Sequence, residues 1–532
     1  MKGKITIVIF LLVFNFCFSQ EHAWVYFTDK PDGNTYLDNP LAMLSQKALN
    51  RRIKQNIILD LRDVPIAKSY IDAIINSAGI LVKTKSKWLN AIHITGSESD
   101  INDLLDLTFV DHVEFAANNL NKNSLSVKLY QEKFEVTDNF NYGSSINQIE
   151  MLKGDFLHKQ NYTGNSMTIA VLDAGFPNVN SFAAFQRIRD NNQILGGYDF
   201  VNRNTNFYSG ISHGTSVLST MAGFVEGELV GTAPDANYYL FITEDASQES
   251  PLEESLWVEA AEKADSLGVD IINTSLGYTT FDDSRYDYTY SDMNGTTAFI
   301  TRGADIAFSR GMIIVNAAGN SGDNPWHYIN APADGFNVLT VGAVDSYENI
   351  TGFSSYGPTS DGRIKPEVNA KGGGATIIDD SGNVSTGSGT SFSSPILCGV
   401  LACFWQAHPD KTNAEIIQIV KESGHLYGAP TDQDGYGIPN FESAFNTLTV
   451  NDIINTRFDF YPNPFEDKIQ FDFSEDQAEF QIKIFDVLGK NIIVRQVSKQ
   501  NSWILTENLS SGVYLMRLEH GEESKTFKII KK

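Results

Sequence analysis

The chain has 532 residues, which allows roughly three to four domains of typical size. Its formal net charge of −25 at pH 7 argues against a nucleic-acid-binding protein, because phosphate recognition needs a basic surface. The acidic balance favours solubility and leaves the substrate open. Function therefore has to be inferred from local patterns along the chain.

The first residues have the pattern of a secretory signal peptide. A basic start, Met1 to Lys4, is followed by the apolar run 5–18, and we predict a signal peptide over residues 1–19. The run is short for a membrane span, and no other stretch is apolar for long enough to cross a bilayer. We therefore expect an exported protein without a transmembrane segment.

Residues 20–117 are predicted to form a small α+β domain. The expected strands are residues 24–27, 80–84, 90–94 and 112–115, and the expected helices are residues 70–77 and 100–107. A further helix is expected to open at Asn39-Pro40 and run through Lys47. With that helix set aside, the order is ferredoxin-like. The polar residues 118–141 lack periodicity and are predicted to be a linker that is cleaved.

Residues 142–448 alternate between strand-like and helix-like runs. The expected strands are 169–172, 238–242, 271–275, 313–315 and 338–341, and the expected helices are 217–224, 256–267, 298–309 and 396–405. Such alternation predicts an α/β domain with a doubly wound parallel sheet and functional groups at the carboxyl ends of its strands. Cys398 and Cys403 point to different faces of the last helix, so no disulfide between them is expected.

Three side chains with catalytic potential stand in their own short motifs. Asp173 follows a buried-strand pattern, His213 precedes small residues and a helix-like run, and Ser391 lies between small residues before an apolar run. Small neighbours let a carbonyl approach the Ser391 hydroxyl, and the following helix directs its positive end toward a developing negative charge. Taken singly, each residue is more commonly a cap, a loop residue or a structural histidine.

Asn320 belongs to a fourth motif, the small-residue turn Ala317-Ala318-Gly319-Asn320-Ser321 after a strand-like run. Its amide could donate a hydrogen bond to an oxyanion, beside the backbone N–H of Ser391. In isolation the same turn would suggest a plain turn former.

Together these motifs resemble the subtilisin-like serine proteases. The segment Gly389-Thr390-Ser391-Phe392-Ser393-Ser394-Pro395 is similar to their nucleophile motif, and Asp173, His213 and Ser391 follow in the family's order. The resemblance implies a catalytic triad of these three residues and an oxyanion role for Asn320. It also implies that the strand Asn273, Thr274, Ser275, Leu276 and Gly277 pairs with an extended substrate peptide. No cofactor is required for catalysis.

Two other functions were weighed against proteolysis. An esterase of the α/β-hydrolase type would carry its acid and base after the serine, whereas both precede Ser391. A non-catalytic adhesion protein on the same fold would be favoured by a substitution at one of the four positions, and none is present. The prediction is a secreted serine endopeptidase that acts on proteins or peptides.

The α+β domain of residues 20–117 resembles the inhibitory propeptide of this family, which assists folding and blocks the active-site cleft until it is cut. The alternative is an accessory domain retained in the mature protein. Two acidic segments, 278–297 and 432–437, suggest structural calcium, but the spacing of the first fits no ordered calcium loop, and the second is expected to belong to the Gly-x-Gly-Ile-Pro-Asn segment that closes such domains. We predict no metal ligands, and expect residues 278–297 to form a surface loop along the substrate cleft.

Residues 449–532 have the two-residue alternation of a small β-sandwich. Expected strands are 469–473, 480–485, 491–497, 513–518 and 525–530, with turns at 488–490 and 510–512. The segments 461–464, 485–489 and 512–514 resemble the C-terminal sorting domain of the type IX secretion system. That resemblance implies secretion machinery as a partner, and an extracellular or surface-attached protein. A carbohydrate- or partner-binding sandwich is the alternative.

Overall fold

The computed structural model describes residues 20–117, 140–447 and 458–532, apart from the short segments 474–478, 487–489, 499–500, 508 and 521–522. We refer to these three parts as the N-terminal, central and C-terminal domains. The predicted signal peptide (1–19), nearly all of the predicted linker (118–141) and most of the predicted turn at 488–490 lie outside the described residues.

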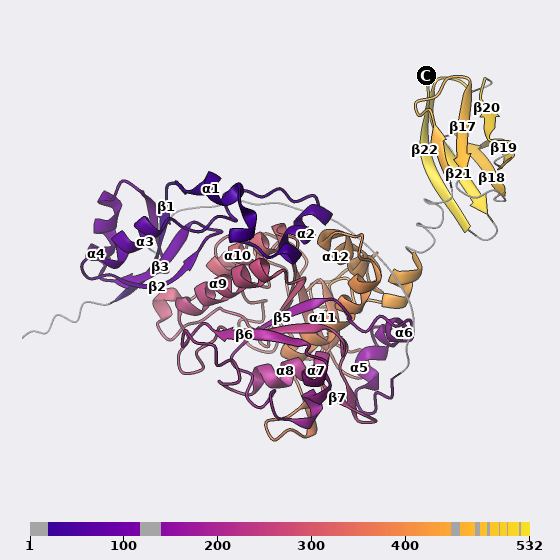
Figure 1. Ribbon diagram of the computed structural model, residues 1–532. Helices are drawn as coiled ribbons and strands as arrows, with labels where there is room; N and C mark the ends of the chain where they lie inside the picture. The colour runs from indigo at the N-terminus through magenta and orange to yellow at the C-terminus, as the bar shows by residue number, and fades with distance from the viewer. Residues whose placement is uncertain are drawn as a thin grey trace, which may run out of the picture.

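The central domain contains a seven-stranded sheet in the order β13-β12-β11-β10-β5-β9-β6 (Figure 1). The strands are β5 (Thr168–Asp173), β6 (Ile194–Asp199), β9 (Asn237–Ile242), β10 (Ile271–Thr274), β11 (Ile313–Ala317), β12 (Val338–Val344) and β13 (Val368–Lys371). All neighbouring pairs are parallel. The strand order reverses beside β5, and ligands of doubly wound sheets bind at such a switch point. The predicted fold class is confirmed.

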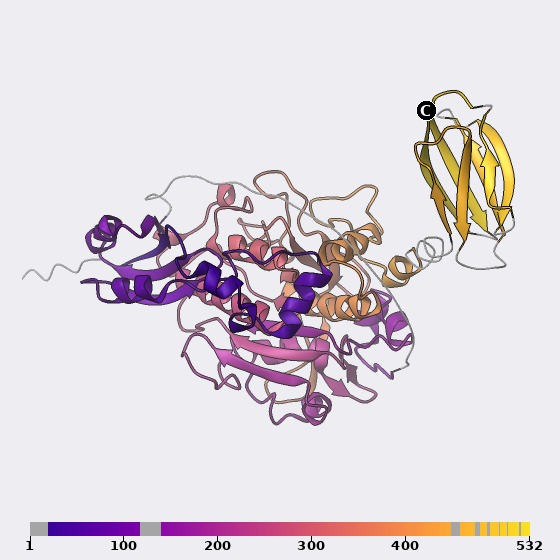
Figure 2. The same cartoon turned by 45° about the horizontal axis from the view of Figure 1, so that its top comes forward.

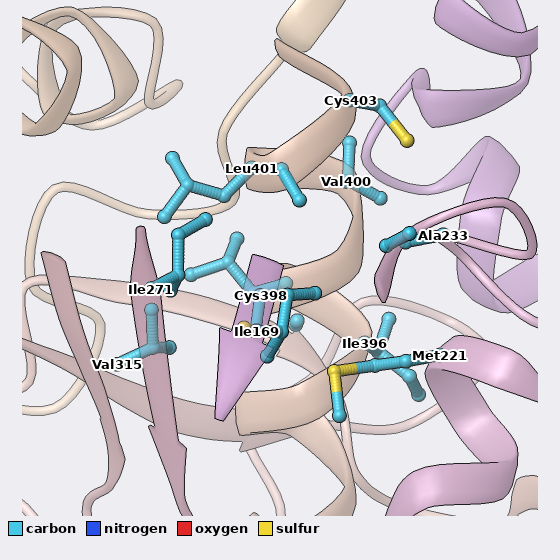
Figure 3. Close-up of a cluster of buried hydrophobic side chains, with 14 of the residues drawn as sticks. Ile169, Met221, Ala233, Ile271, Val315, Ile396, Cys398, Val400, Leu401 and Cys403 are labelled. Atoms are coloured by element: carbon cyan, nitrogen blue, oxygen red, sulfur yellow. The ribbon is translucent and has the colours of Figure 1, made fainter. Parts of the chain in front are cut away.

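Helices cover both faces of this sheet. Successive residues of β5 point to opposite sides, and β5 has apolar residues on each side for the helices to pack against. Ile169 and Val171 pack in one core with helices α8 (His213–Ala222) and α11 (Thr390–Ala407). Ala170 and Leu172 pack in another core with α9 (Pro251–Leu267) and α10 (Phe299–Ser309). Figure 3 shows part of the first core, with Ile169 of β5, Met221 of α8, and Ile396 and Cys398 of α11.

Shorter elements complete the central domain. They are α5 (Ile146–Glu150), α6 (Gly154–His158), η4 (Ala183–Phe185), α7 (Gln186–Asp190), η5 (Ser284–Tyr286), η6 (Tyr290–Asp292), α12 (Asn413–Glu422), and the hairpins β7 (Phe224–Val225) with β8 (Leu229–Val230) and β14 (Ala375–Ile378) with β15 (Val384–Gly387). Of these, the sequence analysis anticipated none, and it also missed β6 and β13.

The N-terminal domain is a four-stranded antiparallel sheet in the order β2-β3-β1-β4. Its elements are β1 (Glu21–Phe27), α1 (Gly33–Leu37), η1 (Pro40–Ala42), α2 (Gln46–Lys54), α3 (Lys68–Ile75), β2 (Leu81–Ser86), β3 (Ala91–Gly96), α4 (Glu98–Asn102), η2 (Asp103–Asp106) and β4 (Val110–Phe115). This is the predicted ferredoxin-like order.

The helix predicted from Asn39 through Lys47 is wrong in its bounds. A single 3₁₀ turn follows Asn39, and α2 begins only at Gln46. The Ser45 hydroxyl accepts a hydrogen bond from the Ala48 N–H at 3.2 Å, whereas Asn39 makes no such capping bond. Because a helix starts where its first free N–H groups find an acceptor, Ser45 sets the start of α2.

The N-terminal sheet packs against the α9–α10 face of the central domain (Figures 1 and 2). Trp24 of β1 stacks on Phe299 of α10, with ring centroids 4.5 Å apart, and its indole N–H donates to Ser255 of α9 at 2.7 Å. The Ser86 hydroxyl of β2 donates to Glu262 of α9 at 2.6 Å. The two domains therefore share one buried apolar interface.

The C-terminal domain consists of two antiparallel sheets, β16-β17-β20 and β19-β18-β21-β22. The strands are β16 (Phe458–Tyr461), β17 (Lys468–Phe473), β18 (Glu479–Phe485), β19 (Asn491–Ser498), β20 (Trp503–Leu505), β21 (Gly512–His520) and β22 (Glu523–Lys531). Apolar side chains from both sheets form one core, which confirms the predicted all-β sandwich. Within the described residues, none of the helices combines the length and the apolar character needed to cross a membrane.

The close contact between α11 and the loop before β9 generates the first prediction. A Cβ added at Gly399 would lie 2.0 Å from Thr232 Oγ1 and 3.0 Å from its carbonyl carbon. Gly399→Ala should therefore lower the free energy of unfolding by about 1–3 kcal/mol, although alanine has the higher helix propensity. Urea unfolding of the full chain, followed by tryptophan fluorescence, measures the change. Gly428→Ala is the control, since no atom lies within 4 Å of its added Cβ; equal midpoints for both variants would contradict the prediction.

Candidate active site

Asp173 is the last residue of β5 and lies at the switch point of the sheet. Its carboxylate is fully buried. One carboxylate oxygen, Oδ1, accepts a hydrogen bond from the Ala174 N–H at 2.8 Å. A buried carboxylate needs such donors, because burial otherwise penalises its charge.

His213 is the first residue of α8, and its Nδ1 lies 2.8 Å from Asp173 Oδ1. The next residue must be glycine for this approach, because a Cβ at position 214 would lie 2.4 Å from the Gly175 carbonyl oxygen and 2.9 Å from Asp173 Cβ. Since a carboxylate only accepts hydrogen bonds, Nδ1 carries the proton and Nε2 of the neutral ring is free to accept one.

The Asp173 carboxylate also changes the acidity of the histidine. Its negative charge, only partly opposed by burial of the ring, raises the pKa of His213 above the ordinary value of 6.5. The imidazolium form is thus stabilised at the position where a base would receive a proton.

Ser391 is the second residue of α11, which begins earlier than the predicted run 396–405. Its N–H belongs to the first turn, where backbone N–H groups have no partner within the helix and the helix dipole is positive. The Ser391 carbonyl accepts a hydrogen bond from the Ser275 hydroxyl at 2.8 Å. The next residue, Phe392, places its ring 6.4 Å from the His213 ring, so the start of α11 lies beside the histidine.

Within the described residues, no hydrogen bond joins the Ser391 hydroxyl to His213. Such bonds are often long in the absence of substrate and shorten in the complex. The structure thus connects Asp173 with His213 directly, and brings Ser391 close to this pair.

Asn320 lies in the loop after β11 and faces the start of α11. Its Oδ1 accepts hydrogen bonds from the Thr390 N–H at 2.8 Å and from the Thr390 hydroxyl at 3.1 Å. Because an N–H can only donate, the amide oxygen must face Thr390, and the amide nitrogen is left as a donor toward the exposed side. Thr390 also accepts from the Gly319 N–H at 3.2 Å. Sequence reasoning missed this supporting role, although Thr390 is part of the serine motif.

The segment 273–277 divides into two parts. Asn273 and Thr274 are buried within β10, paired with β5 on one side and β11 on the other, so their backbone groups are already used. Their side chains bond to Ser394 and Trp257. Only Ser275, Leu276 and Gly277 lie beyond the end of the strand. The predicted substrate strand thus consists of two buried residues of the sheet and three residues beyond its edge, and its pairing with substrate stays a prediction.

Several carboxylates of the two acidic segments make local hydrogen bonds. Asp283 binds Arg285, Asp287 accepts from the Phe281 N–H, and Asp434 accepts from the Thr431 hydroxyl. In the part of the chain that the structure describes, no three His, Cys, Asp or Glu side chains are grouped to hold a metal ion. We assign no metal ligands to these segments.

Family models match the chain in three consecutive blocks. Residues 22–132 match the peptidase S8 propeptide domain of Bacteroidota, and residues 164–439 match the subtilase family. Residues 459–532 match a secretion system C-terminal sorting domain, which indicates type IX secretion to the exterior or to the cell surface.

Several similar proteins are named as subtilisins or serine proteases. A subtilisin of Bacillus pumilus is 31% identical over 303 residues, which cover 56% of this chain and 97% of the relative. Subtilisin NAT of Bacillus subtilis subsp. natto is 29% identical over 381 residues, 70% of this chain and 84% of the relative. Serine protease AprX of Bacillus subtilis is 29% identical over 308 residues, 51% of this chain and 65% of the relative. The chain therefore belongs to the subtilase family, as a secreted serine endopeptidase that is matured by removal of its propeptide.

Proposed function

We propose that Asp173, His213, Ser391 and Asn320 carry the peptidase activity of this chain. The observation that carries the assignment is the 2.8 Å contact between His213 Nδ1 and the buried Asp173 carboxylate, beside the N-terminus of the helix that contains Ser391. Subtilisins need no catalytic cofactor, so protein side chains and backbone groups supply the chemistry.

In the first half of the reaction, the Ser391 hydroxyl oxygen attacks the scissile carbonyl carbon while His213 Nε2 takes the hydroxyl proton. Asp173 stabilises the resulting imidazolium. The negative charge on the carbonyl oxygen is held by the Ser391 N–H and the Asn320 amide nitrogen. The C–N bond then breaks, His213 returns its proton to the leaving amine, and an acyl-Ser391 ester remains. Water then attacks the ester carbonyl carbon while His213 takes its proton. The C–O bond to Ser391 breaks, and His213 returns the proton to the Ser391 oxygen.

The substrate is an extended peptide. Ser275, Leu276 and Gly277 continue beyond β10 toward Ser391, and backbone pairing with such a segment accepts many sequences. We also propose that the N-terminal domain inhibits the enzyme before removal, and that the secretion machinery recognises the C-terminal domain. The domain boundaries follow as a signal peptide (1–19), a propeptide (20–117), a cleaved linker (118–141), a peptidase domain (142–448) and a sorting domain (449–532).

Ser391→Ala should abolish self-processing, because the chain would lack the nucleophile. Intact mass of the purified protein is expected to show propeptide still attached in this variant and absent from the wild-type peptidase chain. Ser388→Ala is the matched control, since its exposed hydroxyl only accepts from the Gly374 N–H. Equal processing of Ser391→Ala and wild type would refute the assignment of the nucleophile.

Two substitutions at Asn320 test its role as a hydrogen-bond donor. Asn320→Asp keeps an oxygen for Thr390 but loses the N–H donor, whereas Asn320→Ala loses both. Each should reduce kcat by about 10²- to 10³-fold with little change in KM, a range taken from subtilisin itself rather than derived for this chain. Steady-state kinetics on a peptide substrate measure the effect. A large rise in KM with unchanged kcat would assign Asn320 to substrate binding instead.

The pH dependence follows from the raised pKa of His213. Only the neutral ring accepts the Ser391 proton, so kcat/KM should fall as the pH drops through that pKa, with a midpoint above 6.5. Asp173→Asn removes the charge that raises the pKa, so the midpoint should move to lower pH while the rate falls by roughly 10⁴-fold. A pH–rate profile tests both, with the exposed Asp190→Asn as control. An unmoved midpoint in Asp173→Asn would count against the assignment.

A further inference from the structure

The N-terminal domain contains a segment that does not belong to its own fold. Residues 33–63, which we name the docking arm, stand between β1 and α3 and include α1, η1 and α2. In the described part of the chain, the apolar core of the ferredoxin-like sheet draws on none of these residues. A 31-residue insertion therefore has to be stabilised by contacts elsewhere.

Those contacts lie at the end of the central domain opposite the active site. Helix α2 packs on the residue that follows α9, where a Cβ added at Gly268 would lie 2.7 Å from Lys47 Cβ. The Ser45 N–H donates to the Ser266 carbonyl at 2.9 Å, and Gln55 donates to the Gly311 carbonyl at 2.8 Å. Because α9 and α10 lead into β10 and β11, their C-termini lie at the amino edge of the parallel sheet, whereas Asp173 lies at the carboxyl edge.

Buried ion pairs hold the arm to this edge. Arg51 and Arg52 lie 2.5 Å and 2.9 Å from Asp265 in the last turn of α9, and Arg52 also lies 2.6 Å from Asp63 within the arm. The side chains of Arg52, Asp63 and Asp265 are at most 1% exposed. At the rim of this contact, Lys47 bonds to Asp270 at 2.5 Å and is itself 43% exposed.

The docking arm supplies positive charge at the C-terminal end of α9. The last turn of α9 has no basic side chain, although Asp265 places a negative charge at the negative end of the helix dipole. Arg51 from the arm donates to the Val269 carbonyl just beyond that end as well as to Asp265. The site on the central domain thus fits a cationic helix with two adjacent guanidinium groups.

We propose that the docking arm is a second binding site of the propeptide, and that it keeps the cleaved propeptide bound to the peptidase domain independently of the active-site cleft. The sheet of the N-terminal domain packs on the sides of α9 and α10, and the docking arm contacts their C-terminal ends. Two contacts on one rigid domain bind more tightly than either alone, because the second forms at high effective concentration. The proposal rests on the proposed function only in naming the N-terminal domain as the inhibitor.

The test uses the full chain with Ser391→Ala, so that cleavage does not depend on the chain's own activity. Limited trypsin treatment cuts the linker at Lys122, Lys128 or Lys133. Dilution and gel filtration then give the dissociation constant of the propeptide fragment. Arg52→Met removes the cation nearest to the buried Asp63 and one of the two arginines at Asp265, and should weaken binding at least about a hundredfold. Lys47→Met, at the exposed rim, should weaken it by about two- to fivefold.

The matched control is Arg62→Met, because this exposed arginine of the same arm pairs only with the neighbouring Asp60. Its propeptide fragment should bind as tightly as that of the chain with Ser391→Ala alone. Near-UV circular dichroism of each uncut chain reports whether the variant is folded. If Arg52→Met does not fold, the comparison is made with Lys47→Met. If folded Arg52→Met, or Lys47→Met in its place, binds as tightly as Arg62→Met, the arm is no docking site. A wild-type chain that fails to cut itself would count against the proposed catalytic residues and leave this result unaffected.

Discussion

The hydrogen bond between His213 Nδ1 and the buried Asp173 carboxylate is the interaction on which the proposed catalytic arrangement depends. It fixes which ring nitrogen carries the proton, and it raises the pKa of the ring that must accept one. It forms only because β5 ends at the switch point of the sheet and α8 begins beside it, an approach that glycine at position 214 permits. The fold therefore contributes mainly by bringing one strand end and two helix starts together.

This part of the site could be predicted from the sequence because the local pattern around each residue indicates its position in the fold. Asp173 ends an apolar run, and the carboxyl ends of parallel strands meet at one edge, so Asp173 and the residues after β10 and β11 had to be neighbours. The ends of the strands and helices were harder to predict. The run Asn273 to Gly277 reads as one strand, but β10 stops at Thr274, where pairing with β5 and β11 ends. The start of α11 at Thr390 likewise depends on contacts with Asn320 that no local pattern contains.

The contacts between the N-terminal and central domains could not be predicted for the same physical reason. Arg51 and Arg52 meet Asp265 across 214 and 213 residues of sequence, and on their own they resemble an ordinary basic helix surface. The acidic segment 278–297 is another case. Its Arg285 pairs with Glu21, and the Tyr286 hydroxyl accepts from the His22 N–H at 3.3 Å, so it contacts the first strand of the propeptide. In each case, residues that look like part of an ordinary surface segment in sequence contact a segment that is distant along the chain.

The measurement that tests the central claim most directly is the site of covalent labelling by a fluorophosphonate, which reacts only with an activated serine. The matured protein would be labelled, digested and mapped by mass spectrometry. The account predicts one adduct, on the Ser391 hydroxyl, and its loss when His213 is replaced by alanine. An adduct on another serine, or no adduct on folded and matured protein, would contradict the assignment of Asp173, His213 and Ser391 as the catalytic triad.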